Sequence, residues 1–425
     1  MPPPHRLLRA RLVVPVAQPP IADGAVVVSG ERIGAVGRWA ELRAHWAGPV
    51  ADLGEGALLP GLVNAHCHLD YTGLAGQVPP QPSFPDWVKS ILARKSAWTL
   101  EECRHGWLAG AAMLLRTGAT TVADVEAAPE LLPEVWSATP LRVFSFLEMT
   151  GVRSRREPAL VLQEAVDKAA SLPAGRCRAG LSPHAPYSTT AELLRRCAEA
   201  ARARHWRLTI HVAESQDEFE MFTHARGPMY DWLKRNQRDM SDCGGGSPVA
   251  HLAACGVLGE NLIAVHANYL APGDAEVLAR HGVSVVHCPR SHAFFKHEPF
   301  PLAELRRAGV NLCLGTDSLA TVSSAGPQTL ELSMFAEMRA LAAAAPGLPA
   351  EAILHMATVN GARALGLSEQ LGAIAPGLAA DFILIPFAGS PAAVYDAAIH
   401  YQGHVAAAMI GGQCSSVPVP VKCDT

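Results

Sequence analysis

Short apolar runs rich in β-branched residues recur along the chain and are separated by longer amphipathic or Ala/Leu-rich segments. Examples are "TTVADV", "RLTIHVAE" and "VSVVHCP", each of a length that suits one strand. Together with "LVNAH" near the start, the pattern predicts eight strands alternating with helices. This order is typical of an α/β protein, specifically a (β/α)8 TIM-like barrel.

Residues typical of helix ends support the predicted helices. "TTAELLRRCAEAARARH" begins with Thr189 or Thr190 as its N-cap, and "APGDAEVLARHG" ends at Gly282. The predicted strands begin at Leu62, Thr120, Leu141, Arg178, Arg207, Asn261, Val283 and Val310.

Both ends of the chain have a different pattern, in which short apolar runs are separated by glycine turns. "PIADGAVVVSGERIGAVG" near the start predicts a β-hairpin, as do "GAIAPGLAADFILIPF" and "HVAAAMIGGQC" near the end. We expect the two ends to join in a small composite β-sandwich domain of residues 1–57 and 373–425. Residues 58–372 would then form the barrel domain.

The composition suits a globular protein that binds a small molecule. The chain has 425 residues, of which 49% are hydrophobic and 17% charged, enough for a large core. The formal net charge is −4, and no long run of either sign occurs. This argues against nucleic acid or a membrane surface as the partner.

Cysteine spacing and the amino-terminal segment bear on location. The ten cysteines are scattered without a CxxC pair and therefore indicate reduced thiols. Prolines interrupt "MPPPHRLLRARLVVPVAQPP" before a signal-peptide core could form, and no apolar run reaches the roughly 20 residues that span a bilayer. We expect a cytoplasmic protein, and the sequence leaves open whether it forms a homodimer.

Chemistry-bearing side chains stand at the carboxyl ends of the predicted strands, where a barrel enzyme has its active site. These residues are His66 and His68 after the first strand, His184 after the fourth, His211 and Glu214 after the fifth, His266 after the sixth and Asp317 after the eighth. Each alone could be an ordinary structural residue, but their joint placement favours one shared site. Imidazoles with a carboxylate suit a borderline divalent ion such as Zn²⁺ or Fe²⁺.

The ordered motifs resemble a known family. "PGLVNAHCHLD", "SPHAPYS", "HVAESQDE", "VHANYL", "GTDS" and "ATVNGARALG" resemble the amidohydrolase superfamily, in its aminohydrolase branch of purine, nucleoside and pterin deaminases and related triazine hydrolases. The resemblance covers nearly the whole chain. It implies a hydrolase that acts on non-peptide carbon–nitrogen bonds and releases ammonia from a cyclic amidine.

Carried over position by position, the resemblance implies a role for each strand-end residue. His66, His68, His211 and Asp317 would bind the metal; Glu214, His266 and Asp317 would handle protons in catalysis; and His184 would face the substrate. Relatives with two metals have a carboxylated lysine on the fourth strand, whereas "SPHAPYS" contains none. We therefore expect one divalent transition metal, with Zn²⁺ favoured over Fe²⁺.

Loop segments give a finer resemblance, to the aminodeoxyfutalosine deaminases. It rests on "CPRSHAFFKHEPFP", which includes Arg290, Ser291 and His292, and on "PSFPDWVKSIL", which includes Trp87. These four residues are candidate substrate contacts. The resemblance implies a substrate with an aromatic carboxylate. Arg290 or Arg153 could bind that carboxylate through two parallel hydrogen bonds.

The sequence therefore predicts a metal-dependent deaminase of an adenine-type nucleoside or a related aminated heterocycle, with 6-amino-6-deoxyfutalosine as one candidate substrate. The alternatives within the branch are a deaminase of S-adenosylhomocysteine or methylthioadenosine, of guanine or of a pterin, and a triazine-type hydrolase. A binding protein on an inactive barrel is disfavoured, since no expected ligand is missing.

Overall fold

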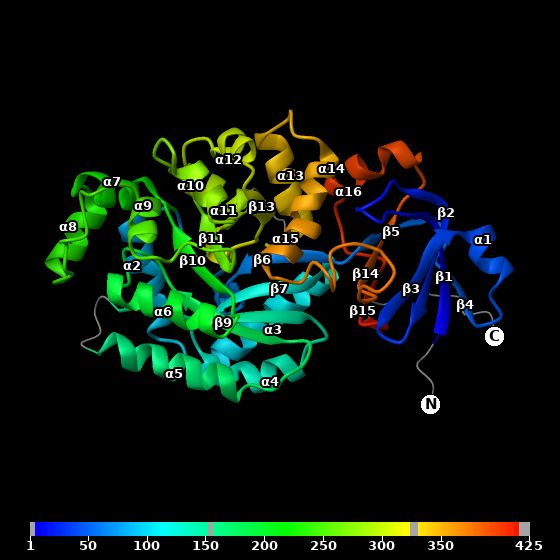
Figure 1. The fold of residues 1–425 in the computed structure, drawn as a ribbon, viewed down its shortest axis with the longest axis horizontal. Coiled ribbons are helices and arrows are strands. Elements are labelled where there is room, and N and C mark those ends of the chain that lie inside the picture. The colour runs from blue at the N-terminus through cyan, green and yellow to red at the C-terminus, as the bar shows by residue number, and fades with distance from the viewer. Residues whose placement is uncertain (1–4, 152–155, 324–329, 416–425) are drawn as a thin grey trace.

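The computed structural model describes residues 5–151, 156–323 and 330–415. Within them the chain forms a parallel barrel surrounded by helices and, to one side, a separate sheet built from both ends of the chain (Figure 1). This architecture confirms the predicted fold class.

The barrel strands follow one another in chain order, and each is parallel to its neighbours. They are β6 (Leu62–Cys67), β7 (Ala119–Glu126), β8 (Arg142–Met149), β9 (Arg178–Pro183), β10 (Leu208–Val212), β11 (Leu262–His266), β12 (Ser284–His287) and β13 (Asn311–Leu314). All eight predicted strands are present, each within a few residues of its predicted start.

Contacts between the first and last strands close the barrel. Cys67 forms a parallel bridge with Asp317, the amide of Thr316 donates to the His66 carbonyl at 3.0 Å, and the amide of His68 donates to the Asp317 carbonyl at 3.1 Å. The buried side chain of Asn64 donates to Thr316 Oγ1 at 2.7 Å and accepts from the Thr316 amide at 3.0 Å. The closure therefore joins the segments that carry His66, His68 and Asp317.

Helices cover the outside of the barrel. They are α3 (Leu100–Arg116), α4 (Leu132–Ser137), α5 (Pro158–Ser171), α6 (Ala191–Ala203), α10 (Asp274–Arg280), α12 (Leu302–Ala308), α13 (Met334–Ala344), α14 (Ala350–Met356) and α15 (Val359–Ala364). Thr190 caps α6 by accepting a hydrogen bond from the Leu193 amide at 3.2 Å, and Gly282 follows α10 with a φ of 68°. Both helix ends agree with the prediction.

Apolar side chains on the two faces of the barrel strands form separate layers. Val63, Phe146 and Val286 belong to a buried cluster with the α15 residues Ala362 and Ala364, whereas Val122, Leu181 and Leu262 pack into a larger cluster with the surrounding helices. Because both faces of a parallel sheet are buried, its strands are almost continuously apolar. The polar strand-end residues are the exception.

The small sheet has the strand order β16-β15-β14-β5-β1-β2-β3, with β4 paired to β1. Its strands are β1 (His5–Val13), β2 (Ile21–Ser29), β3 (Arg32–Arg38), β4 (Val50–Asp52), β5 (Gly56–Pro60), β14 (Phe382–Pro386), β15 (Ala407–Ile410) and β16 (Gln413–Ser415), accompanied by α1 (Trp39–Ala44) and α16 (Val394–Ile399). β5 pairs with β1 and with β14, so it joins the two chain ends. The predicted boundary between residues 57 and 58 falls inside β5.

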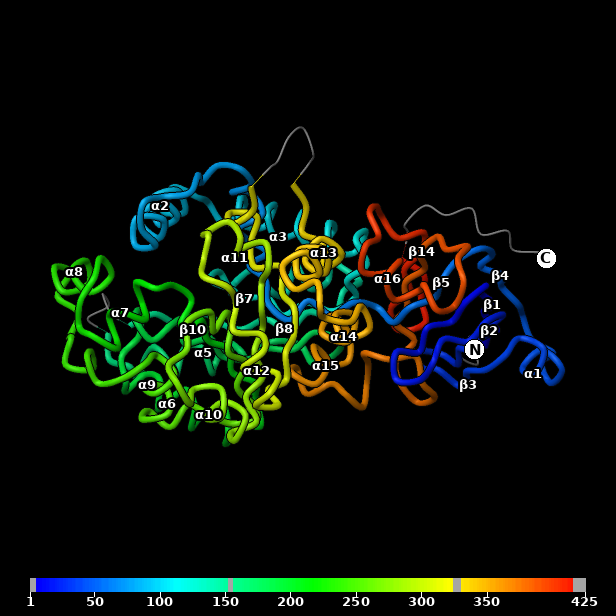
Figure 2. The backbone as a smooth tube through the Cα atoms, turned by 90° about the horizontal axis from the view of Figure 1, so that it is seen from above, coloured from blue at the N-terminus to red at the C-terminus, as the bar shows by residue number. Residues whose placement is uncertain are grey.

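Further short helices lie in the loops that follow the strands. They are η1 (Leu69–Leu74), α2 (Phe84–Lys95), α7 (Gln216–His224), α8 (Pro228–Arg235), α9 (Pro248–Ala254) and α11 (Pro289–Phe295). Figure 2 shows α2 and α8 on the side of the molecule away from the small sheet, and the two helices contact each other. Among the described residues, no helix is both long enough and apolar enough to cross a membrane.

Candidate active site

Four buried side chains converge at the carboxyl ends of the barrel strands. His66 lies in β6, His68 directly follows that strand, His211 lies in β10 and Asp317 follows β13. The Nε2 atoms of His68 and His211 are 3.2 Å apart, and Asp317 Oδ1 lies 3.7 Å from His66 Nε2 and 3.9 Å from His68 Nε2. The structure thus brings together the residues that the resemblance implied as metal ligands.

Two of the clustered histidines are neutral and can therefore act as metal ligands. Burial, followed by the charge of neighbouring histidines, lowers the pKa of His68 and of His211 well below the usual value, so both rings are neutral. His211 Nδ1 lies 2.9 Å from the His184 carbonyl and donates its proton there, which leaves the Nε2 lone pair directed at His68. This lone pair, 3.2 Å from His68 Nε2, can accept a hydrogen bond from His68 or bind a cation.

Asp317 is held as a carboxylate. Its Oδ2 accepts hydrogen bonds from Ser291 Oγ at 2.6 Å and from Thr321 Oγ1 at 3.1 Å, whereas Oδ1 faces the histidines. Burial by itself would raise the pKa of Asp317, but the side-chain interaction with His66 is the main effect that outweighs burial and holds the pKa below the usual range. One oxygen is therefore anchored and the other is free to bind an ion.

These donors fit a divalent transition metal. His66 Nε2 is buried and has no hydrogen-bond partner among the described residues, and the donor atoms of His66, His68 and Asp317 lie within 4.8 Å of one another. Imidazole nitrogens with one carboxylate oxygen are the ligand set of Zn²⁺ and Fe²⁺ sites. No lysine occurs in β9 or in the loop that follows it, so a bridging lysine is not available there.

Glu214 and His266 lie beside this cluster. Glu214 Oε1 is 3.5 Å from His266 Nε2, and both side chains are buried. Burial raises the pKa of Glu214 well above its usual value, with the charges of Asp317 and Glu218 adding to the effect. Burial lowers the pKa of His266 to about 3. The pair therefore consists of a protonated carboxyl and a neutral imidazole.

The backbone at two of these positions is strained. His266 has a φ of 75° and Asp317 a φ of 53°, a region that residues other than glycine seldom adopt. Such a conformation costs about 1–3 kcal/mol and persists when the surroundings enforce it. At the ends of β11 and β13 it turns the chain out of the strand direction.

The cluster faces a cavity of about 290 Å³. His68, His211, Glu214 and Asp317 line part of it. The remaining wall is mostly apolar and comes largely from α2 and α8; it includes Phe84, Trp87, Ile91, Leu92, Trp232 and Leu233. A cavity of this kind binds a small, largely apolar molecule and orients it with a few polar groups.

A comparison with family models identifies the chain's relatives. Residues 57–414 match the model described as the amidohydrolase family. The chain belongs to the amidohydrolase family. A second model, an imidazolonepropionase-like composite domain of bacteria, matches residues 24–48 in the small sheet domain. Membership confirms the family resemblance read from the motifs.

Individual relatives of this amidohydrolase include a 5-methylthioadenosine/S-adenosylhomocysteine deaminase of Moorella thermoacetica, which is 31% identical over 89% of this chain and 85% of the relative. A zinc-bound adenosine deaminase of Xanthomonas campestris has a TM-score of 0.84 and 27% identity, covering 97% of this chain and 93% of that one. Aminofutalosine deaminase of Helicobacter pylori, complexed with methylthio-coformycin, has a TM-score of 0.84, covers 96% and 100% of the two chains, and at 21% identity supports the fold alone.

Two of the predicted substrate contacts, His184 and Trp87, line the cavity. His184 Nδ1 is hydrogen-bonded with Ser188 Oγ at 2.6 Å. The Trp87 indole packs edge-on against Phe295, with ring centroids 4.9 Å apart, and its Nε1 is buried without a hydrogen-bond partner among the described residues. Both side chains are therefore positioned to contact a bound molecule.

The other predicted contacts lie elsewhere. Ser291 bonds to Asp317, and His292 Nδ1 is hydrogen-bonded with Asn268 at 3.1 Å; neither residue lines the cavity. The Arg290 guanidinium binds the buried Glu337 carboxylate at 2.5 Å and the Glu331 carbonyl at 3.0 Å. Arg290 does not line the cavity, and its Nη2 is buried without a hydrogen-bond partner among the described residues, so a contact of Arg290 with the substrate stays a prediction that the pairing with Glu337 disfavours. Arg153 lies outside the described residues.

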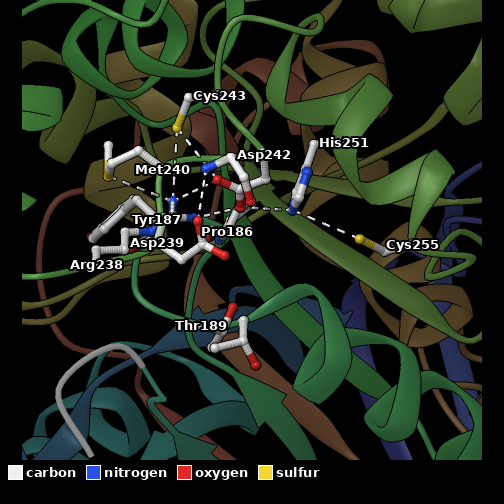
Figure 3. A network of polar contacts seen from close by, with 12 residues as sticks. Pro186, Tyr187, Thr189, Arg238, Asp239, Met240, Asp242, Cys243, His251 and Cys255 are labelled. Carbon is white, nitrogen blue, oxygen red and sulfur yellow. Dashed lines mark hydrogen bonds and ion pairs between the residues drawn. The ribbon is translucent and has the colours of Figure 1, made fainter. Parts of the chain in front are cut away.

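Sequence reasoning did not find Arg238, a buried residue whose guanidinium lies at the centre of a network of polar contacts (Figure 3). It donates to the carbonyls of Pro186 and Tyr187, each at 3.1 Å, and binds both carboxylate oxygens of Asp242 at 2.6 and 2.7 Å. Since Tyr187 also lines the cavity, Arg238 holds the loop after β9 in place. "RNQRDMSDC" contains no signal of this long-range role.

We expect purified protein to bind close to one equivalent of divalent transition metal per chain, because one set of donors converges. His211→Ala should lose most of its metal on dialysis, whereas His297→Ala, which removes a histidine bonded to Tyr269, should keep it. Elemental analysis measures both. Two equivalents in the wild type, or full occupancy in His211→Ala, would contradict a single site built on His211.

We expect Arg238→Met to lower the free energy of unfolding by about 3 kcal/mol, because it leaves a partly buried carboxylate and the carbonyls of Pro186, Tyr187 and Asp239 without their donor. Arg226→Met is the matched control: the Arg226 side chain is far more exposed in its ion pair with Glu220, so a much smaller loss is expected. Urea denaturation compares the two. If both variants lose the same free energy of unfolding, Arg238 stabilises the protein no more than an exposed ion pair does.

Proposed function

We propose that this protein is a hydrolytic deaminase of adenine nucleosides that uses one zinc ion. The supporting observation is the combination of a metal-compatible histidine and aspartate cluster with a protonated Glu214, both lining one cavity. The names of the 5-methylthioadenosine/S-adenosylhomocysteine deaminase and the adenosine deaminase agree with this chemistry.

His66, His68, His211 and Asp317 would hold the ion. A bound divalent ion supplies Lewis-acid chemistry and lowers the pKa of a coordinated water from about 15.7 to about 7. Zinc is favoured over iron because the Xanthomonas campestris relative has zinc bound and because zinc tolerates a cluster of imidazoles with an open position.

Glu214 is suited to proton transfer toward the substrate. A carboxyl group whose pKa is raised by burial can donate its proton to a ring nitrogen, which makes the adjacent amino-bearing carbon more electrophilic. His266, which is neutral and 3.5 Å from Glu214, can donate a hydrogen bond to the oxygen that develops negative charge. The ionised Asp317 can accept a proton from the attacking water.

The cavity wall favours substrates whose 5' substituent is apolar. Phe84, Trp87 and Trp232 provide aromatic surface. Among the described lining residues none is an arginine or a lysine, and Arg290 is occupied by Glu337. A methylthio or unsubstituted 5' carbon therefore fits this wall better than an aromatic carboxylate or an amino-acid group.

We also propose a cytoplasmic location. Each cysteine of the described residues is a free thiol, as expected for a protein of a reducing compartment.

Ammonia release from a panel of compounds tests the proposed function. The panel contains adenosine, 5'-methylthioadenosine, S-adenosylhomocysteine, 6-amino-6-deoxyfutalosine, guanine, a pterin and an aminated triazine. We expect 5'-methylthioadenosine or adenosine to have the highest kcat/KM. A best substrate without an adenine ring would contradict the proposal, and a preference for 6-amino-6-deoxyfutalosine would contradict the account of the cavity wall.

Glu214→Gln should retain its metal and lose about 10²–10⁴-fold in kcat, because the amide keeps the size of the side chain but cannot transfer the proton. Glu192→Gln, on the exposed face of α6, is the control and should keep wild-type kcat. A Glu214→Gln enzyme within tenfold of the wild type would remove Glu214 from the mechanism.

A further inference from the structure

Glu148 is a carboxylate in the wall of the cavity that the proposed chemistry does not use. It lies near the carboxyl end of β8, and its side chain is 16% exposed. Among the described residues Glu148 pairs with His184, whose Nε2 is 3.8 Å from Oε1, a distance too long for a hydrogen bond. A partly buried carboxylate pays a desolvation cost that hydrogen-bond donors normally offset.

The position of Glu148 relates it to the metal cluster through His184. The rings of His184 and His211 have centroids 4.9 Å apart, Glu148 Oε1 is 3.8 Å from His184 Nε2, and all three residues line the cavity. Glu148 itself is not in contact with the metal ligands in the described residues. A purine whose amino-bearing carbon lies at the cluster would place its sugar away from the cluster, where a lining carboxylate such as Glu148 can reach it.

The surrounding charge indicates which donors Glu148 would receive. The Lys95 ammonium binds Asp70 Oδ2 at 2.8 Å and lies 4.0 Å from the centroid of the Tyr71 ring. Although burial opposes it, the charges of Tyr71, Asp70 and Glu148 raise the pKa of Lys95 above the usual range, so a cation already stands near Glu148. A second cation, such as the ammonium of an amino-acid substituent, would be repelled.

We propose that Glu148 binds the vicinal hydroxyl groups of the substrate's ribose and thereby selects ribonucleosides over deoxynucleosides. A carboxylate presents two oxygens side by side, which match two neighbouring hydroxyl donors. The neutral hydroxyls give Glu148 the donors that the described residues do not supply and add no charge next to Lys95. This inference rests on the proposed nucleoside deaminase function and adds the specificity for the sugar.

The test compares 5'-methylthioadenosine with its 2',3'-dideoxy analogue on the wild type and on Glu148→Gln. The amide keeps the shape of the side chain but accepts hydrogen bonds through one oxygen only and without charge. We expect the wild type to prefer the ribonucleoside by about 10- to 100-fold in kcat/KM, and the ratio to fall toward one in Glu148→Gln. A ratio that stays unchanged in the variant would overturn the proposal, since a structural role affects both nucleosides alike.

A second readout does not depend on turnover. Trp87 and Trp232 line the cavity, so quenching of tryptophan fluorescence can report binding of the same two nucleosides. If ribonucleoside binding is tighter and depends on Glu148 while no ammonia is released from either compound, the sugar site holds and the deaminase function fails. If the wild type binds the two compounds equally or binds neither, the sugar site is overturned. Glu192→Gln serves as the control in both assays.

Discussion

The pairing of the first and last barrel strands is the constraint on which the site depends. Hydrogen bonds between the His66 and Asp317 segments, supported by the Asn64 side chain, close the barrel and place ligands that are about 250 residues apart within a few ångströms. The closed barrel also buries these groups, which keeps the imidazoles of His68 and His211 neutral and leaves His66 Nε2 without a hydrogen-bond partner among the described residues. A divalent cation would occupy these donors, so fold closure and metal binding would stabilise each other.

A second set of interactions fixes the walls around this centre. Arg238 ties the loop after β9 to the segment that follows α8, and Arg290 ties the start of α11 to Glu337 on α13. Both arginines pair with carboxylates that are largely removed from water, and both hold backbone groups next to cavity or ligand residues. The helices α2 and α8 then provide an apolar wall that would exclude water from the reacting atoms.

The sequence predicted the parts of this molecule that depend on local pattern. The β-branched runs marked each barrel strand, and the residue types at their ends gave the order of the ligands, because parallel strands have their carboxyl ends on one side. Contacts between side chains that are far apart in the sequence were not predictable. Nothing in "CPRSH" indicates that Arg290 meets Glu337, 47 residues later, and no local signal links Arg238 to Tyr187. Glu148 was overlooked because a single carboxylate at a strand end has no motif; its place in the cavity wall beside His184 is visible only in the folded chain.

The central claim is that one ion binds to imidazole nitrogens and a carboxylate oxygen at the mouth of the barrel. X-ray absorption spectroscopy of the metal-loaded protein measures this directly. The account predicts that only nitrogen and oxygen atoms coordinate the metal and that the spectrum also contains the outer-shell scattering typical of several imidazole ligands. A sulfur neighbour, which Cys67 between the two histidines would supply, or a second metal at roughly 3.5–4 Å would contradict it.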